Sequence, residues 1–279
     1  MFYTPFNFQK TSAVPVAPVE QCFASNGTWS CCPGTVCVEV VAIGGGGGGG
    51  GGVASQGGSS APSCSAAGQG GGGAGGVSIC VLTSGFGSTE CVIIGAGGAG
   101  GSQGTPPSTT AGGDGGATCF GTLVCAGGGG GPASYSGNSA TRTRGAGGVG
   151  NQGTSPFGGF SGCFTNGGPP ATAGDSATGF PGGGGGAMGI RTGGFAGYPG
   201  CLGGAGSTIC GITLGAGGNA GLTRIGPSSG GTIGDSKTNG QCYGAGGGGG
   251  GGGCNTTGSP NYTGANGFQG ILKVIQYFS

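Results

Sequence analysis

The chain has 279 residues, of which 87 are glycine, and its seven Lys and Arg exceed its six Asp and Glu by one, for a net charge of +1. Charged residues make up only 5% of the chain, which argues against nucleic acid as a partner and against attraction to an anionic membrane surface. No stretch reaches the roughly 18 apolar residues of a membrane span, because glycine interrupts every aliphatic run.

Residues 1–26 differ from the rest of the chain because they contain three prolines and no glycine. Their aromatic side chains, which supply large and rigid contact area, are Phe2, Tyr3, Phe6 and Phe8. Such a segment indicates either a docking peptide for a partner or an extended arm on the protein's own surface. We divide the chain into a docking arm, residues 1–26, and a glycine-rich body, residues 27–279.

Short runs rich in β-branched residues, each stopped by glycine, predict strands along the body. The predicted strands are Thr35–Ile43, Val77–Leu82, Glu90–Ile94, Ala117–Cys125, Ser207–Leu214 and Gly270–Phe278. No apolar period of 3.6 residues lasts three turns, and each interior glycine would cost a helix about 1 kcal/mol. We therefore expect an all-β or irregular fold with essentially no α-helix.

Glycine runs follow the strands directly. The runs are Gly44–Gly52, Gly70–Gly73, Gly127–Gly131, Gly182–Gly186 and Gly246–Gly253. Their lengths vary and there are only 15 prolines, which excludes a collagen repeat. Disordered chains combine high net charge with low hydrophobicity, whereas the mean hydropathy here is +0.11. We therefore predict packed polyglycine II helices with three residues per turn, a glycine-rich sandwich, rather than flexible linkers.

Polar and aromatic residues between the later glycine runs form the candidate contact surface, because rigid scaffolds with aromatic loops commonly build binding sites. The candidates are Tyr135, Arg142, Arg144, Phe157, Phe160, Phe164, Phe180, Arg191, Phe195 and Tyr198. The alternative is that these rings only cap the ends of the bundle.

Residue types that commonly act in catalysis are scarce in this sequence. Histidine, the commonest general base and metal ligand, is absent, and the six carboxylates are widely spaced. No phosphate-binding loop ends in one of the three lysines, and no Cys-x-x-Cys pair provides zinc geometry. We predict that the protein is not an enzyme and uses neither a cofactor nor a metal ion.

Fourteen cysteines are present, and no secretion signal precedes them, so we expect most of them to be thiols. Half of them fall in or beside predicted strands and are expected to act as small core hydrophobes. These are Cys32, Cys37, Cys80, Cys91, Cys119, Cys125 and Cys210. Pairing among the loop cysteines stays open.

The order of segments resembles the glycine-rich domain of bacteriophage tail fibres and tail-tip adhesins. The similar stretches are Asn26–Gly45 (NGTWSCCPGTVCVEVVAIGG), Ile93–Gly101 (IIGAGGAGG), Gly115–Gly128 (GGATCFGTLVCAGG) and Gly264–Tyr277 (GANGFQGILKVIQY). In that family, a Gly-Thr-Trp strand, a Pro-Gly turn and a β-strand lead into polyglycine. The fourteen cysteines and the lack of a long fibre shaft depart from the family's pattern.

The resemblance implies a virion structural protein that is assembled in the host cytoplasm and attaches the particle to a host cell-surface receptor, a glycan or an outer-membrane protein. Other tail or fibre proteins of the virion would hold residues 1–26. A homo-oligomer is expected, and a trimer would help to bury a body short of large side chains, although a monomeric tip also fits. A tail or capsid location stays open.

Two other functions fit the composition. Flat polyglycine bundles can present regular Thr, Ala and Ser faces, as ice-binding proteins do, but irregular loops with Phe, Tyr and Arg favour specific recognition. The chain could instead be an extracellular filament subunit, with the aromatic arm donated to the next subunit.

Overall fold

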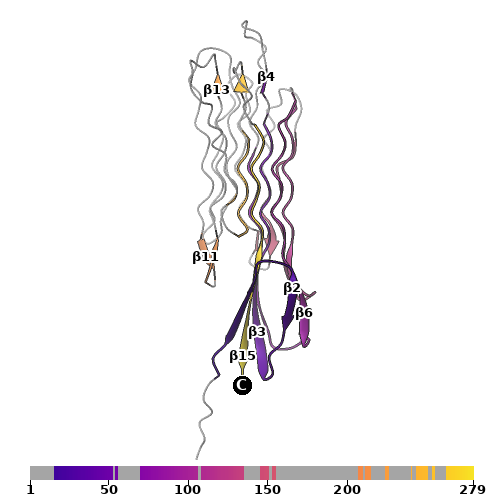
Figure 1. The fold of residues 1–279 in the computed structure, drawn as a ribbon, viewed down its shortest axis with the longest axis vertical. Coiled ribbons are helices and arrows are strands. Elements are labelled where there is room, and N and C mark those ends of the chain that lie inside the picture. The colour runs from indigo at the N-terminus through magenta and orange to yellow at the C-terminus, as the bar shows by residue number, and fades with distance from the viewer. Residues whose placement is uncertain are drawn as a thin grey trace, which may run out of the picture.

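The structure, a computed structural model, has two parts along one long axis: a β-sandwich at one end and a bundle of extended glycine-rich segments rising from it (Figure 1). The C-terminus lies at the free end of the sandwich. The residues that the structure describes are 16–52, 54–55, 70–105, 108–134, 145–150, 153–154, 207–209, 211–214, 224–225, 240, 243–250, 253–254 and 262–279. Within them all regular elements are strands, and no helix is long and apolar enough to cross a membrane.

Fifteen strands occur in the described part of the chain. In chain order they are β1 (Val19–Phe23), β2 (Gly27–Ser30), β3 (Thr35–Ile43), β4 (Ala54–Ser55), β5 (Val77–Leu82), β6 (Thr89–Ile93), β7 (Thr118–Phe120), β8 (Val124–Ala126), β9 (Val149–Gly150), β10 (Gly153–Thr154), β11 (Ser207–Ile209), β12 (Ile212–Leu214), β13 (Arg224–Ile225), β14 (Gly253–Cys254) and β15 (Ile271–Phe278). The predicted all-β fold is thereby confirmed.

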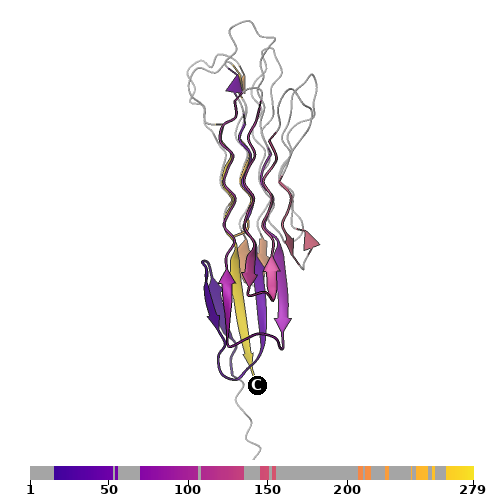
Figure 2. The ribbon, with the colours of Figure 1, turned by 90° about the vertical axis from the view of Figure 1, so that its right-hand side faces the viewer.

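The sandwich consists of two four-stranded antiparallel sheets (Figure 2). The first sheet has the order β1-β15-β3-β5, with Ile43 of β3 opposite Ile271 of β15 and Val77 of β5. The second sheet has the order β2-β6-β7-β8. Strand β1 lies inside the segment predicted as a docking arm, so that segment contributes an edge strand to the first sheet.

Glycine turns divide two segments that the sequence predicted as single strands. Residues 117–125 form the β7–β8 pair around Gly121, which has a φ of 52°, and residues 207–214 form the β11–β12 hairpin around Gly211, with a φ of 76°. Positive φ values suit glycine because it has no Cβ. In a chain so rich in glycine, these two turn residues give no distinct signal.

The main hydrophobic core lies between the two sheets. Trp29 of β2 is fully buried at its centre and packs edge-to-face on Phe120, with the ring centroids 5.2 Å apart, and on Phe86 at 6.2 Å. The cluster comprises Trp29, Val38, Val40, Ala42, Val92, Phe120, Val124, Ala126, Leu272 and Val274. These residues alternate along their strands with outward-facing ones, as half-buried strands require.

A second cluster covers the upper part of the first sheet's outer face. Ile212 of the β11–β12 hairpin packs against Val41 and Ile43 of β3, with Val77 and Ile271 beside them. This cluster attaches the hairpin to the sandwich at the base of the bundle.

The cysteines depart from the prediction that they fill the core. Of the seven predicted cysteines, Cys80 does pack against the core, but Cys91 is exposed on β6. Cys119 and Cys125 face outward and form a disulfide between β7 and β8. Alternation explains the difference, because both neighbours of Cys119 and both neighbours of Cys125 already point into the core.

The centre of the bundle is a straight segment of residues 44–52, here called the central pass. Its N–H groups point in three directions in turn, since Gly47 donates to Gly73, Gly48 to Gly113 and Gly49 to Ala265, each at 2.9 Å. The N–H groups of residues 44–46 and of residues 50–52 donate to the same three neighbouring segments in the same order. This period of three confirms the predicted polyglycine II geometry.

Six neighbouring passes surround the central pass. Its N–H groups donate to residues 70–76, 110–116 and 262–268, which run antiparallel to it. Its carbonyl groups accept from Gly98, Gly129 and Gly247, each in a further pass. Every N–H group of the central pass therefore finds an acceptor in another pass, and most of its carbonyl groups accept a hydrogen bond from one.

Only glycine fits this arrangement. A Cβ atom added to any residue from Gly44 to Gly49 would lie well inside contact distance of a backbone carbonyl group, such as that of Ala99 for Gly48 or that of Gly248 for Gly49. The polyglycine runs are therefore required by the close approach of backbones.

Candidate functional site

The far end of the bundle is the place where its passes end. Strands β4, β14 and β13 lie there side by side and pair in parallel (Figure 1). Strands β4 and β14 prolong the passes of residues 44–52 and 246–250, which run away from the sandwich. The chain therefore turns back at this end, and we call it the distal end.

Some predicted contact residues follow the end of a described pass in the sequence. The chain leaves the bundle at Ser134 and re-enters it at Gly145, and residues 135–144 join these points. The segment contains Tyr135, Arg142 and Arg144, which lie outside the described residues.

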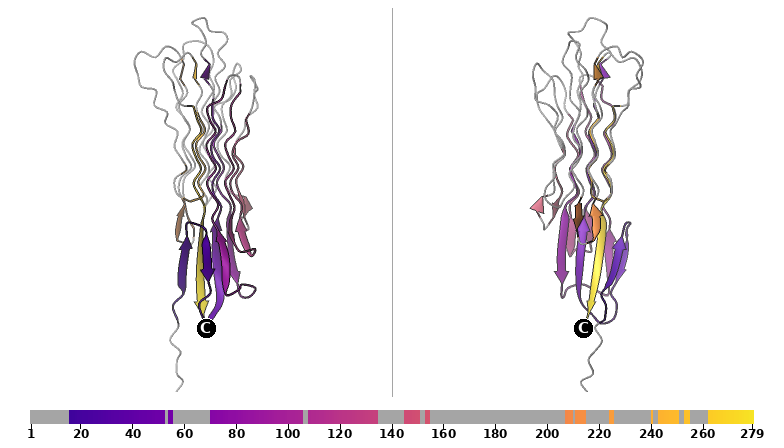
Figure 3. Two further views of the ribbon diagram at one scale, coloured as in Figure 1. Left: turned by 45° about the vertical axis from the view of Figure 1, so that its right-hand side comes forward. Right: turned by 90° about the vertical axis from the view of Figure 1, so that its left-hand side faces the viewer.

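The other predicted contact residues lie between β10 and β11, both of which sit near the sandwich (Figure 3). They too are outside the described residues: Phe157, Phe160, Phe164, Phe180, Arg191, Phe195 and Tyr198. The same holds for the predicted docking residues, which are Phe2, Tyr3, Phe6 and Phe8. The described chain begins at Val16, and β1 starts opposite Gln276, near the C-terminus at the free end of the sandwich.

The described carboxylates act separately. Glu20 pairs with Lys273 at 2.9 Å, Glu90 accepts from the Gly87 N–H group, and Asp114 accepts from the Gly131 N–H group. Among the described residues, no three acidic or cysteine side chains come together as a metal site. Each of these three carboxylates therefore has a partner of its own.

Tyr277 and Glu39 form a polar contact on the outer face of the first sheet. The Tyr277 hydroxyl donates to Glu39 Oε2 at 2.9 Å. This hydrogen bond raises the pKa of Tyr277 above 10.0, and desolvation and the nearby negative charge act in the same direction. The neutral phenol is thus held as a donor.

One side of the bundle, here called the lateral face, carries short side chains at every third position. Ala96, Ala99 and Ser102 are exposed on one pass, while Gly95, Gly98 and Gly101 between them are buried. The next pass exposes Ala111, Asp114 and Ala117. The three-residue spacing of Ala96 and Ala99 is the only sign of this regularity in the sequence of that pass.

Polar side chains satisfy backbone groups at the border of the lateral face. The Gly100 N–H group donates to Asn266 Oδ1 at 2.7 Å, and Asp114 takes the Gly131 N–H group at 2.8 Å. Where no further pass is available, a side chain thus supplies the acceptor.

Fold and surface together define an all-β protein in which a sandwich of two antiparallel sheets carries a polyglycine bundle. Within that class, the chain belongs to the family of the glycine-rich domain, whose model matches residues 22–277. No curated protein matches the sequence. The glycine-rich part of the predicted resemblance is confirmed, and the match includes the strands of both sheets.

Proposed function

We propose that the protein is a non-enzymatic structural protein of a phage virion, a tail-fibre or adhesin component that recognises a host cell-surface receptor. The observation that carries the proposal is the polarity of the fold. Strands β4, β14 and β13 pair at the distal end of the bundle, whereas β1 and β15 begin and end at the free end of the sandwich.

A rigid bundle suits such a role. Each residue of the central pass from Gly44 to Gly52 donates a hydrogen bond to another pass, so the distal end is held at a fixed distance from the sandwich. Loops on a rigid scaffold tolerate variation while the scaffold keeps its shape. Receptor specificity would then reside in segments such as 135–144.

The polarity also supports a proposal for the partners. Residues 1–26 would attach the sandwich end to other tail or fibre proteins of the virion, and the distal end would meet a glycan or an outer-membrane protein of the host. The protein would act on the extracellular particle, after assembly in the host cytoplasm as a homo-oligomer, with a trimer as one arrangement.

Cell binding tests the proposal. The labelled full-length protein is expected to bind some strains in a panel of bacteria, and the substitutions Tyr135→Ala, Arg144→Ala and Tyr198→Ala are expected to weaken binding. Val81→Ala, at an exposed position on the sandwich, is the matched control. Binding that none of the three loop substitutions changes would remove the proposed contact surface.

The lateral face favours ice binding as a second candidate function. Three residues of a polyglycine II helix rise about 9 Å, so Ala96, Ala99 and Ser102 repeat at a regular spacing along one pass. Thermal hysteresis of the purified protein tests this, with Ala99→Tyr expected to abolish it and Val81→Tyr expected to leave it unchanged. Wild-type protein without thermal hysteresis would exclude this function.

A further inference from the structure

The outer face of the second sheet gathers sulfur atoms. On β6, Val92 points into the core, so its neighbours Cys91 and Ile93 point outward. Ile93 lies opposite Cys119 of β7, and Cys119 lies opposite Cys125 of β8. A free thiol and a disulfide therefore share one face.

Both sulfur groups are accessible. Cys91 and Cys125 are exposed, while Cys119 is half-buried. Gly121, directly after β7, lies beside Cys91; its N–H group donates to the Cys91 carbonyl at 2.7 Å, and it has no side chain to cover the thiol. On this face Ile93 is 48% exposed and Leu123 37% exposed, Thr28 of β2 lies opposite Cys91, and a carboxylate oxygen of Glu90 lies close to Gly121.

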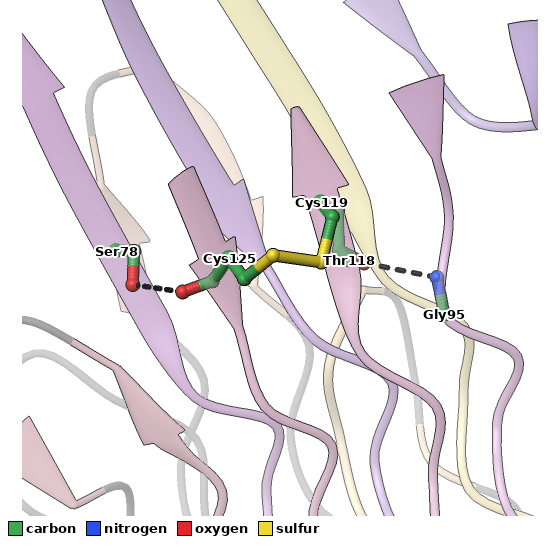
Figure 4. Close-up of a disulfide and its surroundings, with 5 residues drawn as sticks. All are labelled: Ser78, Gly95, Thr118, Cys119 and Cys125. Carbon is green, nitrogen blue, oxygen red and sulfur yellow. Dashed lines mark hydrogen bonds between the residues drawn. A yellow bond between two sulfur atoms is a disulfide. The ribbon is translucent and has the colours of Figure 1, made fainter. Parts of the chain in front are cut away.

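The disulfide adds little to what already joins β7 and β8. Its cysteines are only six residues apart, and loop closure over such a short separation removes little freedom from the unfolded chain. The Leu123 N–H group already donates to the Phe120 carbonyl across the same turn, and Ser78 Oγ donates to the Cys125 carbonyl at 2.7 Å (Figure 4). The strands are held without the sulfur–sulfur bond.

We propose that this face is a thiol–disulfide exchange site that takes an incoming thiol at Cys125. The incoming thiolate attacks Cys125 Sγ, which forms a mixed disulfide, and the bond to Cys119 breaks. The electron pair of that bond leaves with Cys119 as a thiolate, which takes up a proton from water. The exchange needs no oxidant, because one disulfide replaces another.

The thiol has two possible sources: a small molecule or Cys91 of a second copy. Within one copy, Cys91 is a diagonal neighbour of Cys119, at a typical Cα separation of about 7–8 Å. Disulfides span Cα separations of about 4.4–6.8 Å, so exchange inside one sheet would require backbone movement. Between two copies this restriction does not apply.

Two arms of one experiment test the site on the full-length oxidised protein, without oxygen. In the first arm, reduced glutathione is added at about pH 8.5, where ordinary thiols ionise appreciably. After acid quenching, peptide mapping is expected to find glutathione on Cys125 and a newly free Cys119. In the second arm no thiol is added, and concentrated protein is expected to form disulfide-linked dimers that Cys91→Ser abolishes.

Controls separate exchange from damage to the fold. Cys80→Ser, which removes a half-buried thiol facing the core, is expected to change neither arm. Cys125→Ser is expected to abolish the adduct, and circular dichroism checks its folding. Because mapping uses the wild-type protein, the first arm does not depend on any variant folding.

Either product supports the site and identifies the source of the thiol. A Cys119–Cys125 disulfide that stays intact in both arms overturns the proposal. So does a purified protein in which Cys119 and Cys125 are both alkylated as free thiols before any thiol is added.

Discussion

The sandwich and the bundle are stabilised by opposite means. In the sandwich, side chains such as Trp29 and Phe120 fill the space between two sheets. In the bundle, the absence of side chains lets backbones meet, and hydrogen bonds between passes replace the hydrophobic core. One chain therefore contains a region that depends on large side chains and a region that excludes them.

The largest expected loss of stability comes from removing a large side chain from the core of the sandwich. Trp29→Ala should lower the free energy of unfolding by about 3–5 kcal/mol, because it leaves a cavity against Phe86 and Phe120. Thermal or denaturant unfolding measures this loss. Thr28→Ala, next to Trp29 but exposed, is the control and should change stability little. A mild effect of Trp29→Ala would mean that the bundle sustains the fold without this core.

In the bundle, adding a side-chain atom at a buried position should destabilise the protein more than adding one at an exposed position. Gly98→Ala would place a methyl group against the backbones of Gly113 and Gly48, and overpacking of this kind costs about 1–3 kcal/mol. Ala99→Ser is the matched control one residue along, because Ala99 is exposed. Equal melting temperatures of the two variants would contradict the close packing of the passes.

Ion pairing should contribute less than either kind of packing. Glu20→Gln removes the partner of Lys273, whose side chain is 11% exposed, but Glu20 itself is 57% exposed and therefore screened by water. We expect a loss of about 0.2–1 kcal/mol in unfolding experiments. The difference from wild type should shrink at high salt, and a difference that grows with salt would argue against the pair.

The smallest expected effect is the change with pH in the stabilisation that Tyr277 contributes. Because the pKa of Tyr277 is raised in the folded protein, first by its hydrogen bond to Glu39, the stabilisation is complete below 10.0, the pKa of an unperturbed tyrosine. It is lost as the pH rises through the higher pKa of the folded state. The wild type should therefore melt at a higher temperature than Tyr277→Phe. This difference should be constant up to about pH 9 and should decrease above pH 10.

Glu39→Gln is the companion variant, because it keeps the phenol but removes the charged acceptor. It should also weaken the pH dependence of the melting temperature above pH 10. A gap between wild type and Tyr277→Phe that widens in alkali would rule out the phenol as the stabilising form.

The local sequence pattern predicted the strands well where a run of β-branched residues is followed directly by glycine. Strand β3 occupies the predicted Thr35–Ile43, and β5 the predicted Val77–Leu82. Strand β1 was missed because its partner β15 lies at the other end of the sequence, and no local pattern reports such pairing. The three-residue hydrogen-bond period was predicted from the backbone geometry of polyglycine alone.

The surface was harder to predict than the fold. The contact residues from Tyr135 to Tyr198 were chosen for their chemistry, and they lie outside the described residues. The outward direction of Cys119 could have been read from its buried neighbours Thr118 and Phe120. Its pairing with Cys125 could not, because the turn at Gly121 is hidden among so many other glycines.

The pairing of β3 with β15 has a consequence for how the protein is made. Ile43 emerges early from the ribosome, but Ile271, which lies opposite it, is translated more than two hundred residues later. The central pass likewise waits for residues 262–268 to accept a third of its hydrogen bonds. Folding dominated by such distant contacts is slow, so the nascent glycine-rich chain must stay soluble without its final partners until translation is nearly complete.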